Sequence, residues 1–241
     1  MRGVRLQMVT KLCGRVPSRR AVAALALFAV AIVAKPSAAP SVGRVEGLVR
    51  LTAASLRPVP SGVYPSRRVS TAVVHAAPEM NNVVVFIKNA PPRERVPLMR
   101  ATISQKDEAF VPRVVAITTG STVEFPNFDP YFHNVFSLSR AANFDLGRFP
   151  RGDSRTRKFT TGGLVKVYCQ IHSHMSASIL VFTHDYFQIP DRDGSFALTD
   201  VPAGDYEISA WHERIGESVR QVRVDAGQRA RVEFSLPVND R

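Results

Sequence analysis

Side chains that can bind a metal are concentrated in one short stretch of the sequence, VYCQIHSHM. It contains one thiol, two imidazoles and one thioether, at Cys169, His172, His174 and Met175. A thiolate and two imidazoles in a trigonal arrangement, with a weak axial thioether, form a mononuclear site that suits both oxidation states of copper. A structural zinc site would use more cysteines than the stretch provides. The stretch is therefore a candidate copper site.

A further histidine, His133, could complete such a site from elsewhere in the chain. Side chains alternate along the preceding strand, LVKVYC, which points the Cys169 thiol inward at the strand's end. The loop that follows is long enough to return His172 and Met175 to the same metal. We expect His133 to reach the site from the end of a distant strand.

Two other interpretations of Cys169 stay open at this point. The residue could be a buried apolar side chain without any ligand role. It could also be a nucleophile with His172 as its base, although the two residues share one short loop and no third group orients them. His75, His184 and His212 have no partners at metal-ligand spacing, so we expect surface or core roles for them.

The elements around these residues are predicted to be strands. Short runs rich in Val, Ile and Phe alternate with Gly, Pro, Asn and Asp, and almost no segment has helical periodicity. We therefore expect an all-β protein built from β-sandwiches. The predicted strands begin at Gly43, Asn82, Ala101, Arg113, Ser121, His133, Arg155, Leu164, Ala177, Gly194, Gly204, Ser218 and Arg229.

The C-terminal strands follow a regular pattern, DRDGSFALTDVPAGDYEISAWHE, then an alternating strand, the turn DAGQ and RVEFSL. This pattern resembles the second half of a carboxypeptidase regulatory-like domain, a small transthyretin-like β-sandwich. The segment GRVEG, which starts at Gly43, matches the strand with which that domain normally begins. The resemblance implies one discontinuous sandwich made of residues 43–95 and 185–238, with a second domain inserted between them. Three consecutive units are the alternative.

The inserted segment, residues 98–183, carries several further motifs. They are CxxHxxM from Cys169, the sequence His133-Asn134-Val, the segments FVP and TGSTVEFPN, and the closing strand SILVF. Together they resemble cupredoxins of the plastocyanin and amicyanin type. The two-residue gap between histidine and methionine is that of amicyanin. The whole layout is similar to exported bacterial proteins labelled methylamine-utilisation proteins.

The cupredoxin resemblance implies a role for each residue of the site. One copper ion would be bound by the side chains of His133, Cys169, His172 and Met175. Asn134 would support the site through its backbone amide, which can bond the thiolate sulfur. His172 would be the solvent-facing ligand through which electrons pass. His174 departs from the family pattern, and we expect it to be solvent-exposed or an alternative ligand.

The same resemblance implies an electron carrier rather than an enzyme. Copper enzymes of this fold usually place a histidine directly beside the ligand cysteine, whereas Cys169 has Tyr168 and Gln170 as neighbours. A binuclear copper site would need a second cysteine in the loop. We therefore expect a one-electron carrier between redox partner proteins. The alternatives are a periplasmic copper carrier or sensor, and a carbohydrate- or protein-binding β-sandwich with an accessory metal site.

The N-terminal residues 1–39 predict an export signal, with a basic stretch, an apolar run from Ala21 to Ala34 and small residues after it. The run is shorter than the roughly 20 residues of a membrane span, so we expect no stable membrane insertion once the signal is cleaved. An uncleaved anchor is the alternative. SRRAVA, from Ser18, resembles a twin-arginine signal, and the general secretory route is equally open. The expected location is the periplasm.

The net charge and the cysteine count bear on two further questions, nucleic-acid binding and disulfide formation. The formal net charge is +12, but the seven basic residues before position 40 leave about +5 for the rest of the chain. No base-reading motif accompanies this charge, so we expect no nucleic-acid partner. Cys13 lies in the predicted signal, which leaves Cys169 without a disulfide partner in the mature protein.

Overall fold

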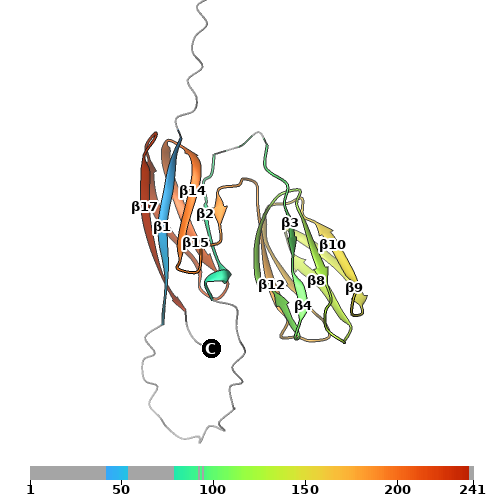
Figure 1. Ribbon diagram of the computed structural model, residues 1–241. Coiled ribbons are helices and arrows are strands. Elements are labelled where there is room, and N and C mark those ends of the chain that lie inside the picture. Colours follow the sequence, from blue (N-terminus) through green and yellow to red (C-terminus); the bar gives the residue numbers. More distant parts are fainter. Residues whose placement is uncertain (1–41, 54–78, 92, 94, 239–241) are drawn as a thin grey trace, which may run out of the picture. The chain divides into compact units, whose positions relative to one another are not determined.

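Figure 1 shows a computed structural model of the chain, which describes residues 42–53, 79–91, 93 and 95–238. Apart from one short 3-10 helix, η1 (Glu79–Asn82), the regular elements in these ranges are strands, which confirms the all-β prediction. Among the described residues, no helix is long and apolar enough to cross a membrane. The predicted export signal lies outside them.

Strands from both ends of the described chain pair with one another. β1 (Val42–Ala53) lies between β14 (Ser195–Pro202), which is antiparallel to it, and β17 (Arg229–Val238), which is parallel to it. Gly47 permits this three-stranded arrangement, because a Cβ atom there would lie within 2.7 Å of two atoms of the Phe196 ring. The close approach of the neighbouring strands explains the second glycine of the GRVEG motif.

A second sheet in this part of the chain has the order β13-β2-β15-β16. Its strands are β2 (Val83–Ile87), β13 (Phe187–Gln188), β15 (Gly204–His212) and β16 (Gly216–Val224). Alternate side chains of the two sheets form one buried apolar core, which includes Val45, Val85, Ile208 and Phe234. The segments before and after the inserted region thus share strands and a core.

The candidate copper site belongs to a separate set of strands. A five-stranded sheet has the order β6-β12-β11-β8-β9. Its members are β6 (Val114–Thr118), β8 (His133–Ser139), β9 (Ala142–Phe149), β11 (Gly163–Tyr168) and β12 (Ser176–Phe182). β11 and β12 form an antiparallel hairpin, and Tyr168 of β11 pairs with Phe136 of β8. The end of β11 therefore lies beside β8.

A smaller sheet and a hairpin complete this sandwich. The sheet has the order β10-β7-β3, with β3 (Arg100–Thr102), β7 (Thr122–Pro126) and β10 (Ser154–Lys158). The hairpin consists of β4 (Ser104–Lys106) and β5 (Ala109–Val111). Buried side chains of these strands form a core that also contains Cys169 and Met175. The site therefore lies at the edge of a packed apolar interior.

Several details of the strands differ from the sequence-based expectation, and the short strands β5 and β13 were not predicted. β9 was not among the predicted strands, because only Phe144 and Phe149 of its eight residues are buried and the apolar alternation is weak. The predicted single strand ATISQ is divided at Ile103 between β3 and β4, which pair with different neighbours. The turn of the resulting β4–β5 hairpin donates two backbone hydrogen bonds to Asp129.

Candidate metal centre

The ligand loop connects the two strands of the β11–β12 hairpin. Cys169 follows directly after β11, and its backbone N–H donates to the carbonyl oxygen of Met175 across the loop, at 3.3 Å. The Met175 N–H donates in turn to the His172 carbonyl oxygen, at 3.0 Å. Both bonds close the loop on itself, while the side chains of Cys169 and Met175 are buried in the core. The loop is thus a compact turn held by the sheet.

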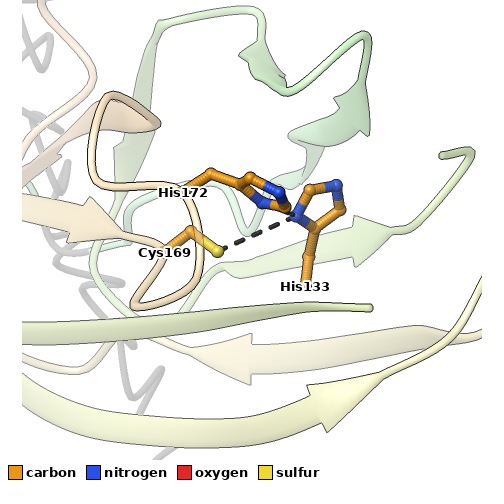
Figure 2. Close-up of side chains that lie close together, drawn as sticks. All are labelled: His133, Cys169 and His172. Atoms are coloured by element: carbon orange, nitrogen blue, oxygen red, sulfur yellow. Dashed lines mark hydrogen bonds between the residues drawn. The ribbon is translucent and has the colours of Figure 1, made fainter. Parts of the chain in front are cut away.

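Three donor atoms converge at this loop (Figure 2). His133 Nδ1 lies 3.8 Å from Cys169 Sγ and 3.0 Å from His172 Nδ1. All three ligand atoms lie within 4.8 Å of one another. Bonds of about 2.0–2.3 Å from a single metal to nitrogen and sulfur would place its ligand atoms at separations of this order. The geometry therefore brings together the predicted His133, Cys169 and His172.

The two histidines approach the centre from different environments. His133 begins β8 and is fully buried, whereas His172 lies on the loop and is half-buried. Their rings meet edge to face, with centroids 4.7 Å apart. A buried imidazole on a strand and a half-buried imidazole on a loop give the centre one fixed side and one side near solvent.

The side chain of His174 lies outside this group of donor atoms. Its side chain is 62% exposed, and its Nε2 atom lies 3.6 Å from Glu108 Oε2. The centroid of its ring is 6.1 Å from that of His172. His174 is not a member of the group of converging donor atoms. Of the two loop imidazoles, the structure places His172 beside His133 and Cys169.

The fourth predicted ligand, Met175, is 1% exposed and packs in the same core as Cys169. Its burial fits a thioether that approaches the metal from the core, and its ligand role stays a prediction. Asn134 is also buried, and its side-chain oxygen accepts the Gln170 backbone N–H at 2.7 Å. This bond ties the residue after Cys169 to β8. The Cys169 sulfur lies 3.8 Å from His133 Nδ1, and the bond from the Asn134 backbone amide to the sulfur stays a prediction.

One carboxylate beside His133 was not predicted from the sequence. Asp129 is 5% exposed, and its Oδ2 atom lies 2.9 Å from His133 Nε2. Burial would raise the pKa of Asp129, but hydrogen bonds from the Glu108 N–H, the His133 ring and the Asp107 N–H outweigh it and lower the pKa. The Asp-Pro pair four residues before His133 is the one sequence signal that could have indicated a turn here.

The other histidines have the roles expected for residues without metal-spaced partners. His184 and His212 are buried, and burial is the main cause that lowers the pKa of each. His212 Nε2 lies 3.0 Å from Glu79 Oε1. His75 lies outside the described residues.

Apolar side chains are exposed next to the ligands in sequence. Phe128, Tyr131 and Phe132 precede His133 and are each more than half exposed, and Ile171, just before His172, is 41% exposed. The centroid of the Tyr131 ring lies 6.3 Å from that of His172. When exposed apolar side chains form one patch, they commonly mark a contact with another molecule.

Comparison with family models and with curated proteins gave no match. Among solved structures, a purple cupredoxin from Nitrosopumilus maritimus is 24% identical, with a TM-score of 0.31 over 34% of this chain and 98% of that one. Amicyanin from Paracoccus versutus is 18% identical, with a TM-score of 0.32 over 40% of this chain and 96% of that one.

A copper-containing nitrite reductase from Thermus scotoductus SA-01 is 24% identical, with a TM-score of 0.34 over 39% of this chain. The chain spans only 24% of the length of that reductase. These similarities are partial, and the assignment of a metal rests on the donor atoms. One thiolate, two imidazoles and a nearby thioether fit a single copper ion. Soft sulfur ligands and imidazole suit copper, whereas magnesium, calcium and manganese prefer oxygen ligands.

Proposed function

We propose that the protein is a mononuclear blue-copper protein of the cupredoxin kind that carries single electrons in the periplasm. The observation that carries this proposal is the convergence of Cys169 Sγ and the two Nδ1 atoms of His133 and His172 within 4.8 Å. When bound, copper would supply the one-electron redox couple. The chain contributes a rigid donor set, which limits the rearrangement between the two oxidation states.

The surroundings of Cys169 favour a carrier over an enzyme. Tyr168 and Gln170 flank the cysteine, so neither neighbour is an imidazole that could lead to a second metal. Within the described ranges, the centre is the one cluster of three or more converging His, Cys, Asp or Glu ligand atoms. These features support a site that exchanges electrons with other proteins instead of transforming a substrate.

Redox partner proteins are the proposed partners, and the ligand end of the sandwich is the proposed contact. The half-buried His172 lies beside the exposed Tyr131, and the exposed Phe128 and Phe132 lie in the segment that leads to His133. Such a surface can exclude water around a ligand through which an electron passes. It has no pattern of basic and aromatic residues that would indicate nucleic acid.

The flanking strands support the proposed domain organisation. Residues 43–95 and 185–238 would form one carboxypeptidase regulatory-like sandwich, and residues 98–183 the inserted copper domain. The pairing of β1 with β14 and β17, together with the core that forms within each set of strands, supports these boundaries.

A copper carrier or sensor is the second candidate, and it is favoured by one observation. The exposed pair His174 and Glu108 lies next to the ligand loop and could receive copper from the site or pass it on. In that case the protein would bind copper without being a competent one-electron carrier.

The visible spectrum of the copper-loaded protein tests the proposal. We expect an intense thiolate-to-copper band at about 600 nm that bleaches reversibly on reduction. The Cys169→Ala variant should lose the band and most of its copper affinity. A wild-type protein that binds copper without this band, or a Cys169→Ala variant with full affinity, would show that the carrier proposal is wrong.

A further inference from the structure

The imidazole of His133 is held from both sides. Its Nδ1 atom faces Cys169 and His172, and its Nε2 atom faces the buried carboxylate of Asp129 at 2.9 Å. A carboxylate accepts and cannot donate when ionised, so Nε2 carries the proton and donates it. The lone pair of Nδ1 is then directed at the metal position.

We propose that Asp129 is a positioning residue of the copper centre, which fixes the tautomer and orientation of His133 and strengthens the imidazole as a ligand of copper(II). This inference rests on the proposed function, because it concerns the same site. A carboxylate that accepts from a metal-bound imidazole raises the basicity of the ligand, and a more basic ligand stabilises the higher charge of copper(II) more than that of copper(I).

The hairpin turn between β4 and β5 is built around this carboxylate. The Asp107 N–H donates to Asp129 Oδ1 at 2.6 Å, and the Glu108 N–H donates to Oδ2 at 2.9 Å. Both turn residues have φ near 54°, in the left-handed region, although neither is glycine. A two-residue hairpin turn needs this conformation at both positions, and it is strained for residues other than glycine. Strain of this kind persists where the surrounding contacts require it, and here it aims two N–H groups at one carboxylate.

Asn127 fixes the other end of the same segment. Its side-chain oxygen accepts the Asp129 N–H at 2.9 Å, and its amide nitrogen donates to the carbonyl oxygens of Tyr131 and Phe149, at 2.8 and 3.1 Å. Asn127 is fully buried. The position of the Asp129 carboxylate is therefore held by contacts with the rest of the protein.

Two roles of Asp129 must be distinguished: a purely structural one and the positioning of His133. If Asp129 only capped the hairpin turn, its removal would lower the free energy of unfolding without changing the preference of the site for one copper oxidation state. If it acts through His133, its removal changes the ratio of copper(II) to copper(I) affinity. That ratio is measured as the reduction potential.

The experiment compares the full-length, copper-loaded wild type with Asp129→Asn and a matched control, Asp145→Asn. Asp145 is exposed and contacts Asn134 and Gln170, which neighbour His133 and Cys169, but it touches no ligand ring. We expect Asp129→Asn to lower the copper(II)-to-copper(I) affinity ratio about tenfold, which raises the potential by about 59 mV. Asp145→Asn should change the ratio less than about threefold. Thermal unfolding of the copper-free proteins is measured alongside.

An unchanged potential in Asp129→Asn, with or without a loss of stability, would overturn the inference while leaving a blue wild type and the carrier proposal intact. An equal shift in Asp145→Asn would also overturn it, because the effect would then be that of any nearby charge. Should Asp129→Asn fail to fold, ¹⁵N NMR of the wild-type copper(I) protein decides. We expect a protonated Nε2 atom on His133, and an unprotonated one would contradict the inference. A wild type without the band at about 600 nm would instead overturn the function on which the inference rests.

Discussion

The two imidazoles of the ligand loop point to different neighbours, and this difference defines the proposed centre. His172 Nδ1 lies 3.0 Å from His133 Nδ1, whereas His174 is exposed beside Glu108. The sequence could not distinguish them, because both lie close enough to Cys169 along the loop. The direction of each side chain depends on the turn that the bond from the Met175 N–H to the His172 carbonyl closes.

Substitution of each loop histidine in turn distinguishes the roles of His172 and His174. His172→Ala should abolish the thiolate-to-copper band and lower copper(II) affinity by about 100-fold or more, because one equatorial ligand is removed. His174→Ala should leave both unchanged. The measurement is a copper titration followed by visible and electron-paramagnetic-resonance spectra. If His174→Ala loses the band and His172→Ala keeps it, the ligand assignment is wrong.

The place of Asp129 beside His133 could not be predicted from the sequence. The types and spacing of Cys169, His172 and Met175 indicate a metal site because few other functions use that combination. An aspartate, in contrast, is usually exposed, and nothing in its immediate sequence marks it as buried. Its partners are the N–H groups of a hairpin turn about 20 residues away, which only the fold brings to it.

At the scale of elements, most strands were predictable from their apolar or β-branched runs, whereas β5, β9 and β13 were not. β8, β11 and β12 lie where their patterns indicated, and these strands position three of the four proposed ligands. Half of the residues of β9 are exposed and only two are buried, so its sequence lacks the period of a half-buried strand. The split between β3 and β4 depends on which neighbours each one pairs with, and that is not a local property.

The close contact between β1 and its neighbouring strands can be tested at Gly47. A Cβ atom there would meet the Val232 carbonyl oxygen and the Phe196 ring, so Gly47→Ala should lower the free energy of unfolding by about 3 kcal/mol. Gly216→Ala is the control, because its Cβ atom would have open space and costs only about 1 kcal/mol for a left-handed backbone. Denaturant unfolding can be followed by the fluorescence of Trp211, the single tryptophan, which lies in β15. Equal losses in the two variants would contradict the close approach.

At the scale of the whole molecule, the described residues gather into separate buried cores. One contains Cys169 and Met175, another unites strands from opposite ends of the sequence, and a third is formed by residues of β2, β6, β12 and β15. Local patterns predicted both kinds of strand, and the resemblance of GRVEG to the start of a regulatory-like domain suggested that distant segments belong together. The register of β1 against β14 and β17 could not be predicted, because it depends on contacts between residues about 150 or more positions apart.

Buried histidines outside the metal centre make stability depend on pH. Burial lowers the pKa of His212, although Glu79 and Glu213 pull it upward and Arg214 adds to the lowering. The folded protein therefore binds the proton less readily than the unfolded chain, whose pKa is near 6.5. Stability from the neutral imidazole is present above that value and is lost as the pH falls through it.

The copper-free protein should accordingly become easier to unfold as the pH is lowered from about 8 to about 5.5, a window in which the paired carboxylate of Glu79 stays ionised. His212→Gln should be less stable at about pH 8, by about 1–3 kcal/mol, because the bonds to Glu79 and to the Arg214 N–H are weakened. Its stability should nevertheless fall less steeply with acid, since glutamine does not titrate. His174→Gln, at an exposed position, should keep the wild-type slope. Tryptophan fluorescence in denaturant at several pH values measures all three slopes, and a His212→Gln slope equal to that of the wild type would show that His212 does not set this dependence.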